Sequence, residues 1–361
     1  MTGLLTTCGA QFRDGSSSYR LFSQDRLPAA ERFAVVRRAV VAALPPHASV
    51  RACLDDSLLR RSGLHTPSGG WRRDPLGPHF QTNFVRARRF LQTWLVLLTG
   101  DGSCRLIPVA FRHVPTPPKP GKKATAAELQ SYRAQARTAR LRYGPPAPTP
   151  EPVRTDPSPW ETLTLRHGNC THQLRYKRRT GLMWRAAGAH QVLPLIVIAP
   201  LAYRLRQGSK LLYRKPAFLL GTDPNLDPPT LIETYVARWD IEVNFREEKT
   251  LLGVGQAQVR DPRSVQSAPA LTVAAYALRL LATQRAFAAS RQALLPRPKW
   301  QRPDPAARIS TQQALQQLRA EVWARGLGLD HFSAFASPPS PAMKPQNSSF
   351  PLAAAVWYAS A

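Results

Sequence analysis

Four residues between positions 235 and 249 have the types and the spacing of a site that handles a phosphodiester. Tyr235, Arg238, Glu242 and Lys249 are separated by two, three and six residues. Because an α-helix has about 3.6 residues per turn, this spacing predicts that all four side chains share one helical face. A carboxylate, two cations and a phenol that converge suit a metal-bound phosphodiester. The alternative is an amphipathic helix whose charged stripe is merely solvated.

The residues around this stripe favour a helix that ends near Gly253. Apolar flanks are supplied by Leu231, Ile232, Trp239, Ile241, Phe245, Leu251 and Leu252. The pattern Tyr-x2-Arg-x3-Glu-x6-Lys resembles the YREK signature of bacterial insertion-sequence transposases, which have a DDE catalytic triad and an RNase H-like fold. The segments DDSLLRRSG, GWRRDPLGPHFQTNFVRARRFLQ and SAPALTVAAYALRLL resemble stretches of that family in the same order. The resemblance covers the chain up to about Leu295.

The resemblance implies Mg²⁺-dependent DNA cleavage and strand transfer, with Mn²⁺ as a possible substitute and acidic side chains as metal ligands. Asp55 and Glu242 are the expected catalytic residues and metal ligands. The run Asp55-Asp56-Ser57 resembles the family's Asp-x-Ser pattern, and we prefer Asp55 at the end of the first strand. Without the family context, the acidic pair would be a strand end or a helix cap.

The remaining residues of the signature have expected roles and ordinary alternatives. Arg238 and Lys249 would contact phosphates near the cleaved bond, and Tyr235 would donate to a phosphate oxygen. Otherwise the two cations are surface charge, the phenol packs at a helix edge, and Glu242 pairs with Arg238 or Arg246.

The fold expected from the resemblance is an α/β, RNase H-like mixed sheet with a β-strand insertion and a helical C-terminal part. In that fold a fourth strand carries the second catalytic Asp, but here the chain reads GPPAPTPEPVRTDPSPW, which is too rich in proline for a central strand. One core strand is therefore expected to be missing. The segment that normally precedes TGLLTTCGAQF is missing as well, so we expect an internally deleted and N-terminally shortened transposase. Weak substitutes for the lost acid are Asp101, Asp156, Asp223 and Asp240.

The sequence predicts six regions. They are an N-terminal helical segment (1–46), the first part of the core (47–143), a proline-rich junction (144–159), the β insertion (160–227), the YREK helix with a following core helix (228–295) and a helical and irregular tail (296–361). We expect a helix over 31–44, a strand over 48–59, a loop over 62–79, a β-hairpin around GDGS and a helix over 124–143. Four strand-rich stretches follow between 161 and 223.

A basic, aromatic-bearing segment precedes the hairpin. In GGWRRDPLGPHFQTNFVRARRFLQ, Trp71 or Phe80 could stack on a base, and Arg86, Arg88 and Arg89 could contact DNA phosphates. The alternative is a basic loop that packs on acidic helices.

The composition indicates a polyanionic partner. Fifty Lys and Arg against 22 Asp and Glu give a formal net charge of +28, which favours binding to polyanions. The family resemblance implies that this polyanion is double-stranded DNA, both element ends and target. A homodimer in a synaptic complex is possible. No secretory signal is visible, and Arg279 and Arg285 interrupt the most apolar helix, so we expect a cytoplasmic, nucleoid-associated protein without a membrane span. The four cysteines form no CxxC pair, and we interpret His167, Cys170 and His172 as strand-end residues rather than zinc ligands.

Three hypotheses remain open from the sequence. The chain is an impaired transposase, a non-catalytic DNA-binding protein derived from one, or a deleted chain that does not fold stably because neighbouring strands lack a partner.

Overall fold

The chain is a mixed α/β protein with antiparallel sheets and several helices. The computed structural model describes residues 12–24, 26, 28–46, 48, 50–60, 69–74, 83–98, 104–114, 120–121, 124–138, 151–167, 170–183, 192–206, 208–221, 223, 225–257, 261–287 and 309–329. The chain divides into two compact units. Unit 1 comprises residues 1–99, 106–114 and 242–361, and unit 2 comprises residues 100–105 and 115–241.

The sheet of unit 1 is organised around one long strand, β3 (Phe84–Leu98). It pairs antiparallel with β1 (Ala52–Arg60) and with β2 (Gly70–Arg73), and it also pairs with β4 (Cys104–His113). The two strands of the expected hairpin are confirmed as β3 and β4, which pair with each other, while the GDGS segment lies outside the described residues. The expected loop over 62–79 was partly wrong, because β2 lies within it.

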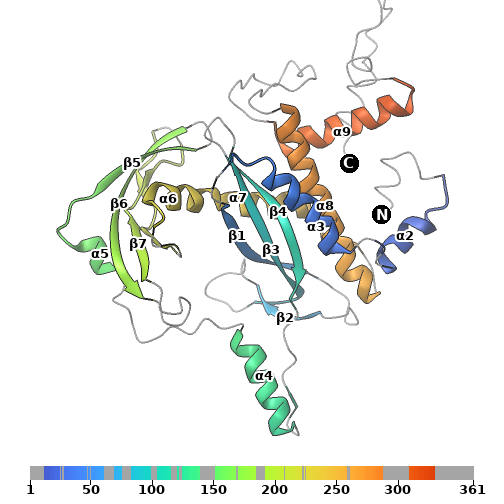
Figure 1. Cartoon of the computed structure of the whole chain (residues 1–361), viewed down its shortest axis with the longest axis horizontal. Coiled ribbons are helices and arrows are strands. Elements are labelled where there is room, and N and C mark those ends of the chain that lie inside the picture. The colour runs from blue at the N-terminus through green and yellow to red at the C-terminus, as the bar shows by residue number, and fades with distance from the viewer. Residues whose placement is uncertain are drawn as a thin grey trace, which may run out of the picture. The chain divides into compact units, whose positions relative to one another are not determined.

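Helices cover this sheet and supply its core (Figure 1). Val36 and Val40 of α3 (Ala29–Val41) pack with Tyr276 and Leu280 of α8 (Pro262–Phe287) and with apolar residues of β3 and β4. The helical spacing that predicted α3 is thus confirmed as a core-facing stripe. Two further helices of the unit are α2 (Ser16–Ser23) and α9 (Thr311–Gly326).

Unit 2 contains a second four-stranded antiparallel sheet in the order β10-β7-β6-β5. Its strands are β5 (Glu161–His167), β6 (Cys170–Met183), β7 (Val192–Ile198) and β10 (Ala217–Leu220). A small hairpin, β8 (Ala202–Tyr203) with β9 (Leu212–Tyr213), lies between β7 and β10 in the chain. These strands confirm the strand-rich series expected between 161 and 223.

Helices pack against both sides of the second sheet (Figure 1). Ile232 of α6 (Pro228–Ala237) joins the core formed by Leu174, Ile196 and Leu219. Val153 of the short α5 (Glu151–Thr155) packs on Leu195 and Val197 of β7. The unit also contains α4 (Ala126–Thr138).

The proline-rich junction forms a helical turn where it is described. Within the described residues, no strand occurs between β4 and β5, and that stretch contains α4 and α5. Residues 139–150 lie outside the described part of the chain.

Helix α8 is the one helix of the described residues that is long and apolar enough to cross a membrane. Its apolar window is 67% buried inside the protein, and Arg279 within it donates to the backbone carbonyl of Thr311. A buried apolar helix is what a soluble protein uses to fill its core, so α8 agrees with the expected packed helix.

Candidate functional site

The four residues of the signature lie on two helices rather than one. Asp227 caps α6, since its carboxylate accepts from the backbone N–H of Thr230 at 2.9 Å, and α6 ends at Ala237. Arg238 forms the junction, and α7 (Trp239–Thr250) follows. Tyr235 and Arg238 belong to unit 2, and Glu242 and Lys249 belong to unit 1. The predicted single helix is therefore wrong at Arg238.

In unit 2, the tyrosine and the arginine of the signature interact with each other. The Tyr235 side chain is half-buried against the apolar core between α6 and the sheet. Arg238 is exposed, and its guanidinium carbon lies 5.9 Å from the centre of the Tyr235 ring. Tyr235 thus packs at a helix edge while Arg238 presents its charge to solvent.

In unit 1, the lysine of the signature fastens α7 to the first strand. The Nζ of Lys249 donates to the Oγ of Ser57 on β1 at 2.6 Å. The same ammonium lies 5.6 Å from the centre of the Phe245 ring, which packs edge-on against Trp94 at 5.1 Å between centres. Burial lowers the pKa of Lys249. This lysine is therefore partly withdrawn from solvent and directed at β1.

Asp55 lies on the side of β1 that faces α7. Its Cα partner on β3 is Gln92, whose neighbours Phe90 and Trp94 along the same face are buried. Strand geometry places Asp55 about 7 Å before Ser57 on that face. The side chain is half-buried, and it accepts from the backbone N–H of Asp56 at 2.8 Å. We expected Asp55 at a strand end, but β1 continues to Arg60, so that placement was wrong.

Glu242 lies at the exposed start of α7 within unit 1. Phe245 contacts Trp94, which pairs with Cys53 of β1. Lys249 contacts Ser57, which follows Cys53 along β1. The two contacts come in the same order along α7 and β1, so these elements run in the same direction across this face. Asp55 falls between these two contacts along β1. Glu242 precedes Phe245 by about one helical turn and so falls outside them.

The adjacent Asp56 has a different environment. It is exposed, and its carboxylate accepts from the Nε of Arg89 at 2.7 Å. Alternation along β1 directs it to the side opposite Asp55. Asp56 is therefore an ion-pair partner on the open side of the sheet.

A buried acid, Glu248, was missed by the sequence reasoning. Only 1% of its surface is exposed, and its Oε1 accepts from the Nε2 of Gln92 at 2.6 Å. Burial raises the pKa of Glu248 to about 8, although Gln92 and Lys249 oppose the rise. Its spacing from buried Ile241 and Asn244 could have located it, because offsets of seven and four return to the same helical face.

The basic segment does not form one surface. Trp71 on β2 is 67% exposed and pairs with Arg86 of β3. Arg88 is 1% exposed on the packed side of the sheet, whereas Arg89 lies on the opposite side with Asp56. The expected phosphate contact at Arg88 therefore conflicts with its burial. Phe80 lies outside the described residues.

The proposed substitutes for a second catalytic Asp have other partners or lie elsewhere. Asp156 binds the buried ammonium of Lys177 at 2.9 Å, and Ser158 and Lys177 lower the pKa of Asp156 to about 2. Asp223 accepts from the backbone N–H of Asn225, and the residue that caps the following helix α6 is Asp227. Asp240 lies on α7 in unit 2, and Asp101 is outside the described residues.

The zinc alternative concerns residues near the ends of β5 and β6. β5 ends at His167 and β6 begins at Cys170, so these two are strand-end residues as we interpreted them. His172 lies within β6 opposite Leu165, so that interpretation was wrong for His172. Among the described residues, no group of three or more His, Cys, Asp or Glu could hold a metal ion.

The described carboxylates do not fit a two-ion site. Asp55 is half-buried and Glu242 is exposed beyond the Phe245 contact, while the nearby Glu248 is held by Gln92 with a raised pKa that favours its neutral form. Two divalent ions need several ionised carboxylates that converge from different elements. We therefore derive no reaction step through a metal.

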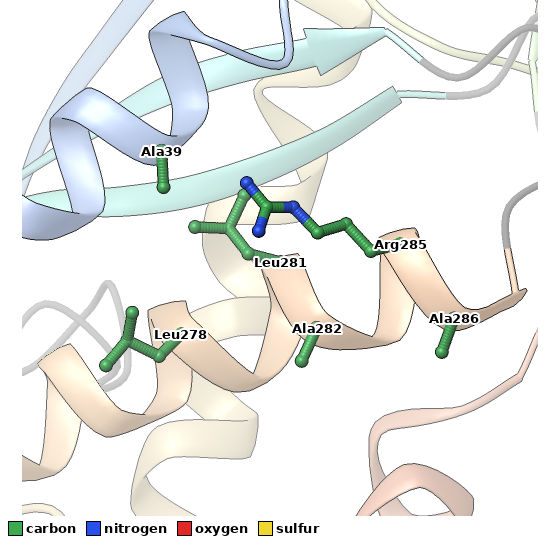
Figure 2. A pocket seen from close by; sticks show the side chains of 6 residues that line it. All are labelled: Ala39, Leu278, Leu281, Ala282, Arg285 and Ala286. Atoms are coloured by element: carbon green, nitrogen blue, oxygen red, sulfur yellow. The ribbon is translucent and has the colours of Figure 1, made fainter.

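A groove on α3 and α8 is separate from these acids. It has a volume of about 460 Å³, and no acidic residue lines it. Figure 2 shows its lining side chains, which are Ala39, Leu278, Leu281, Ala282, Arg285 and Ala286. The groove is mainly apolar and carries no catalytic group.

Neither a scan against protein-family models nor a search of curated proteins finds a match to this chain. The family resemblance therefore rests on the quoted residues and their spacing.

Proposed function

We propose that this chain is a transposase-type protein that binds double-stranded DNA and whose strand-cleaving centre is incomplete. The observation that carries the proposal is the contact between Lys249 and Ser57, with Asp55 on the same face of β1. The lysine of the YREK pattern and the aspartate of the Asp-x-Ser pattern come from segments almost 200 residues apart, so a shared site is what the family resemblance predicts.

The sheet of unit 1 supports an RNase H-like core in this proposal. β3 lies between β1 and β4, so the first three long strands form a meander with the second one in the middle. Helix α7 follows much later in the chain and packs on β1 and β3. The β-rich unit 2 would be the family's insertion before the glutamate helix.

Electrostatics supports DNA as the partner. The net charge of +28 favours binding to phosphates through release of counterions, and exposed Trp71 offers a ring for stacking. The protein would act in the cytoplasm on nucleoid DNA, and a second copy could join it on element ends.

A non-catalytic DNA-binding role is favoured by the environment of the acids. Glu248 of α7 is buried, and its carboxylate accepts from the amide of Gln92, which is the Cα partner of Asp55. We therefore expect binding without turnover, or turnover that is severely reduced.

The test combines binding and nicking. We expect purified protein to bind a DNA duplex in a salt-dependent way and to leave supercoiled plasmid intact with Mg²⁺ or Mn²⁺. Nicking that disappears in both Asp55→Ala and Glu242→Gln would mean that the centre is complete and would overturn its assignment as incomplete. Absence of salt-dependent binding would refute the DNA-binding function.

A further inference from the structure

After Glu161, the first residue of β5, the β-sheet of unit 2 is formed by a stretch of chain without acidic residues. Between Glu161 and Asp223 the sequence contains no Asp or Glu. The same stretch contains eleven cations, which are Arg166, Arg175, Lys177, Arg178, Arg179, Arg185, Arg204, Arg206, Lys210, Arg214 and Lys215. Five of them lie in or next to the β8–β9 hairpin.

The base of this hairpin is held by aromatic rings. Ala202 pairs with Tyr213, and Tyr203 pairs with Leu212. The guanidinium carbon of Arg214 lies 5.2 Å from the centre of the Tyr203 ring and 5.6 Å from that of Trp239, all within unit 2. Contacts of this kind between a guanidinium and ring faces are attractive, so Arg214 acts as a structural clamp.

The tip of the hairpin is closed by Ser209 and Arg204. The Ser209 Oγ donates to the carbonyl of Arg206 at 2.8 Å and accepts from the Arg206 backbone N–H at 3.1 Å. Arg204 donates a guanidinium hydrogen to the Ser209 carbonyl. Gly208 adopts a φ of 80°, which a residue with a side chain rarely takes. These hydrogen bonds join the described residues on the two sides of position 207.

Three cations remain available on this hairpin. Arg206, Lys210 and Lys215 are exposed, and no ion pair holds their side chains within the described part of the chain. Two of them lie at the tip and one lies at the base. No acidic residue occurs within the hairpin, so its own side chains carry only positive charge.

We propose that the β8–β9 hairpin is a phosphate-binding element through which unit 2 grips the backbone of double-stranded DNA, with Arg206, Lys210 and Lys215 as the contacting residues. The inference rests on the proposed DNA-binding function and assigns it a site separate from Asp55 and Lys249. A two-stranded β-ribbon is narrow enough to enter a major groove and to reach phosphates from both of its ends.

An anionic membrane is the competing partner for a basic hairpin. Leu205 and Leu211 are the two apolar side chains between the strands, and Leu205 is 74% exposed. Two leucines provide little apolar area compared with an amphipathic helix that lies in a bilayer surface, so the observations favour the nucleic acid.

The experiment measures duplex binding by fluorescence anisotropy at several salt concentrations with the full chain. The test variant is Arg206→Ala with Lys210→Ala and Lys215→Ala. The matched control is Arg38→Ala with Arg263→Ala and Arg325→Ala, which removes the same charge from exposed helix positions of unit 1. A milder variant, Lys210→Gln with Lys215→Gln, preserves Arg206, whose backbone closes the turn.

We expect the test variant to lower the slope of log K against log salt by about 2 to 3, and the milder variant by about 1 to 2. The control should change the slope by less than about 1. Equal slopes for test and control variants would overturn the hairpin site while leaving DNA binding intact. Wild-type protein without salt-dependent binding would refute the proposed function and this site together. Binding of the same variants to vesicles that contain phosphatidylserine is measured in parallel. If the test variant loses binding to these vesicles but keeps its binding to the duplex, the hairpin contacts membranes and the proposal is wrong.

Discussion

The Nζ of Lys249 lies 2.6 Å from the Oγ of Ser57, although 192 positions separate these residues in the chain. The hydrogen bond joins the helix that carries the glutamate of the YREK pattern to the strand that carries Asp55. A charge-assisted hydrogen bond in a partly buried place fixes both partners more firmly than an exposed ion pair does.

Replacement of Ser57 tests the energetic importance of this contact. Ser57→Ala should lower the free energy of unfolding by about 1.5 to 3 kcal/mol, because the partly buried ammonium of Lys249 loses its acceptor. Lys249→Met in the Ser57→Ala background should recover part of the loss, since no buried charge remains. Urea unfolding of the single and double variants measures both effects. Equal stability of Ser57→Ala and wild type would contradict the contact.

Glu248 should make the stability of the fold dependent on pH. Its pKa is raised from 4.5 to about 8 in the folded protein, so the folded state keeps a proton that the unfolded state releases. This contribution to stability is complete below pH 4.5 and is lost as the pH rises through about 8. The total loss should reach at most about 5 kcal/mol.

Glu248→Gln should remove that dependence while keeping an oxygen that accepts from Gln92. The variant should gain stability over wild type as the pH rises from 5 to 9, and chemical unfolding at several pH values would measure the gain. Glu242→Gln is the control, because that side chain is exposed. Parallel pH profiles for wild type and Glu248→Gln would show that the acid is solvated.

Mutation of Arg88 should lower the stability of the fold, whereas mutation of Trp71 should leave it almost unchanged. Arg88 is buried, so Arg88→Ala should destabilise the fold by about 2 kcal/mol or more through lost packing and lost partners. Trp71 is exposed, so Trp71→Ala should change stability by less than about 0.5 kcal/mol. Thermal unfolding measures the stability of each variant, and titration with a DNA duplex measures its DNA binding. A destabilised Trp71→Ala variant would place that ring in the core instead.

A polar network should stabilise the packing of α7, α8 and α9 in unit 1. The Tyr276 hydroxyl lies 2.6 Å from a carboxylate oxygen of Glu247 and 2.9 Å from the Oδ1 of Asn244, and Thr311 of α9 also donates to Glu247. Tyr276→Phe should cost about 1 to 3 kcal/mol, because the buried Oδ1 of Asn244 and the partly buried carboxylate of Glu247 each lose a donor, although Thr311 still donates to Glu247. Tyr213→Phe, at a 65% exposed position, is the matched control. Similar unfolding midpoints for the two variants would argue against the network.

Elements with strong local patterns could be predicted from the sequence. The apolar spacing in α3 and the Asp-Gly pair in the sequence between β3 and β4 are local signals that need no long-range information. β2 could not be predicted in this way, because Gly-Trp-Arg-Arg has little apolar character and becomes a strand only through its pairing with β3.

The site was harder to predict because burial depends on tertiary packing. Arg88 and Arg89 are neighbours in a basic run, yet strand alternation directs one to the core and the other to Asp56. Glu248 follows Glu247 and looks like another surface charge, but the fold buries it against Gln92. The break between α6 and α7 at Arg238 could not be predicted either, because no proline or glycine lies next to it in the sequence.

The discontinuity of unit 1 has a consequence for its synthesis. Residues 115–241 belong to unit 2 and emerge from the ribosome before α7 and α8, which cover the sheet of unit 1. At a translation rate of about 5 to 20 residues per second, on the order of 10 s pass between the synthesis of β4 and that of these helices. During that interval the apolar side of the nascent sheet is exposed, so we expect chaperone dependence during translation and aggregation when the chain is truncated before α8.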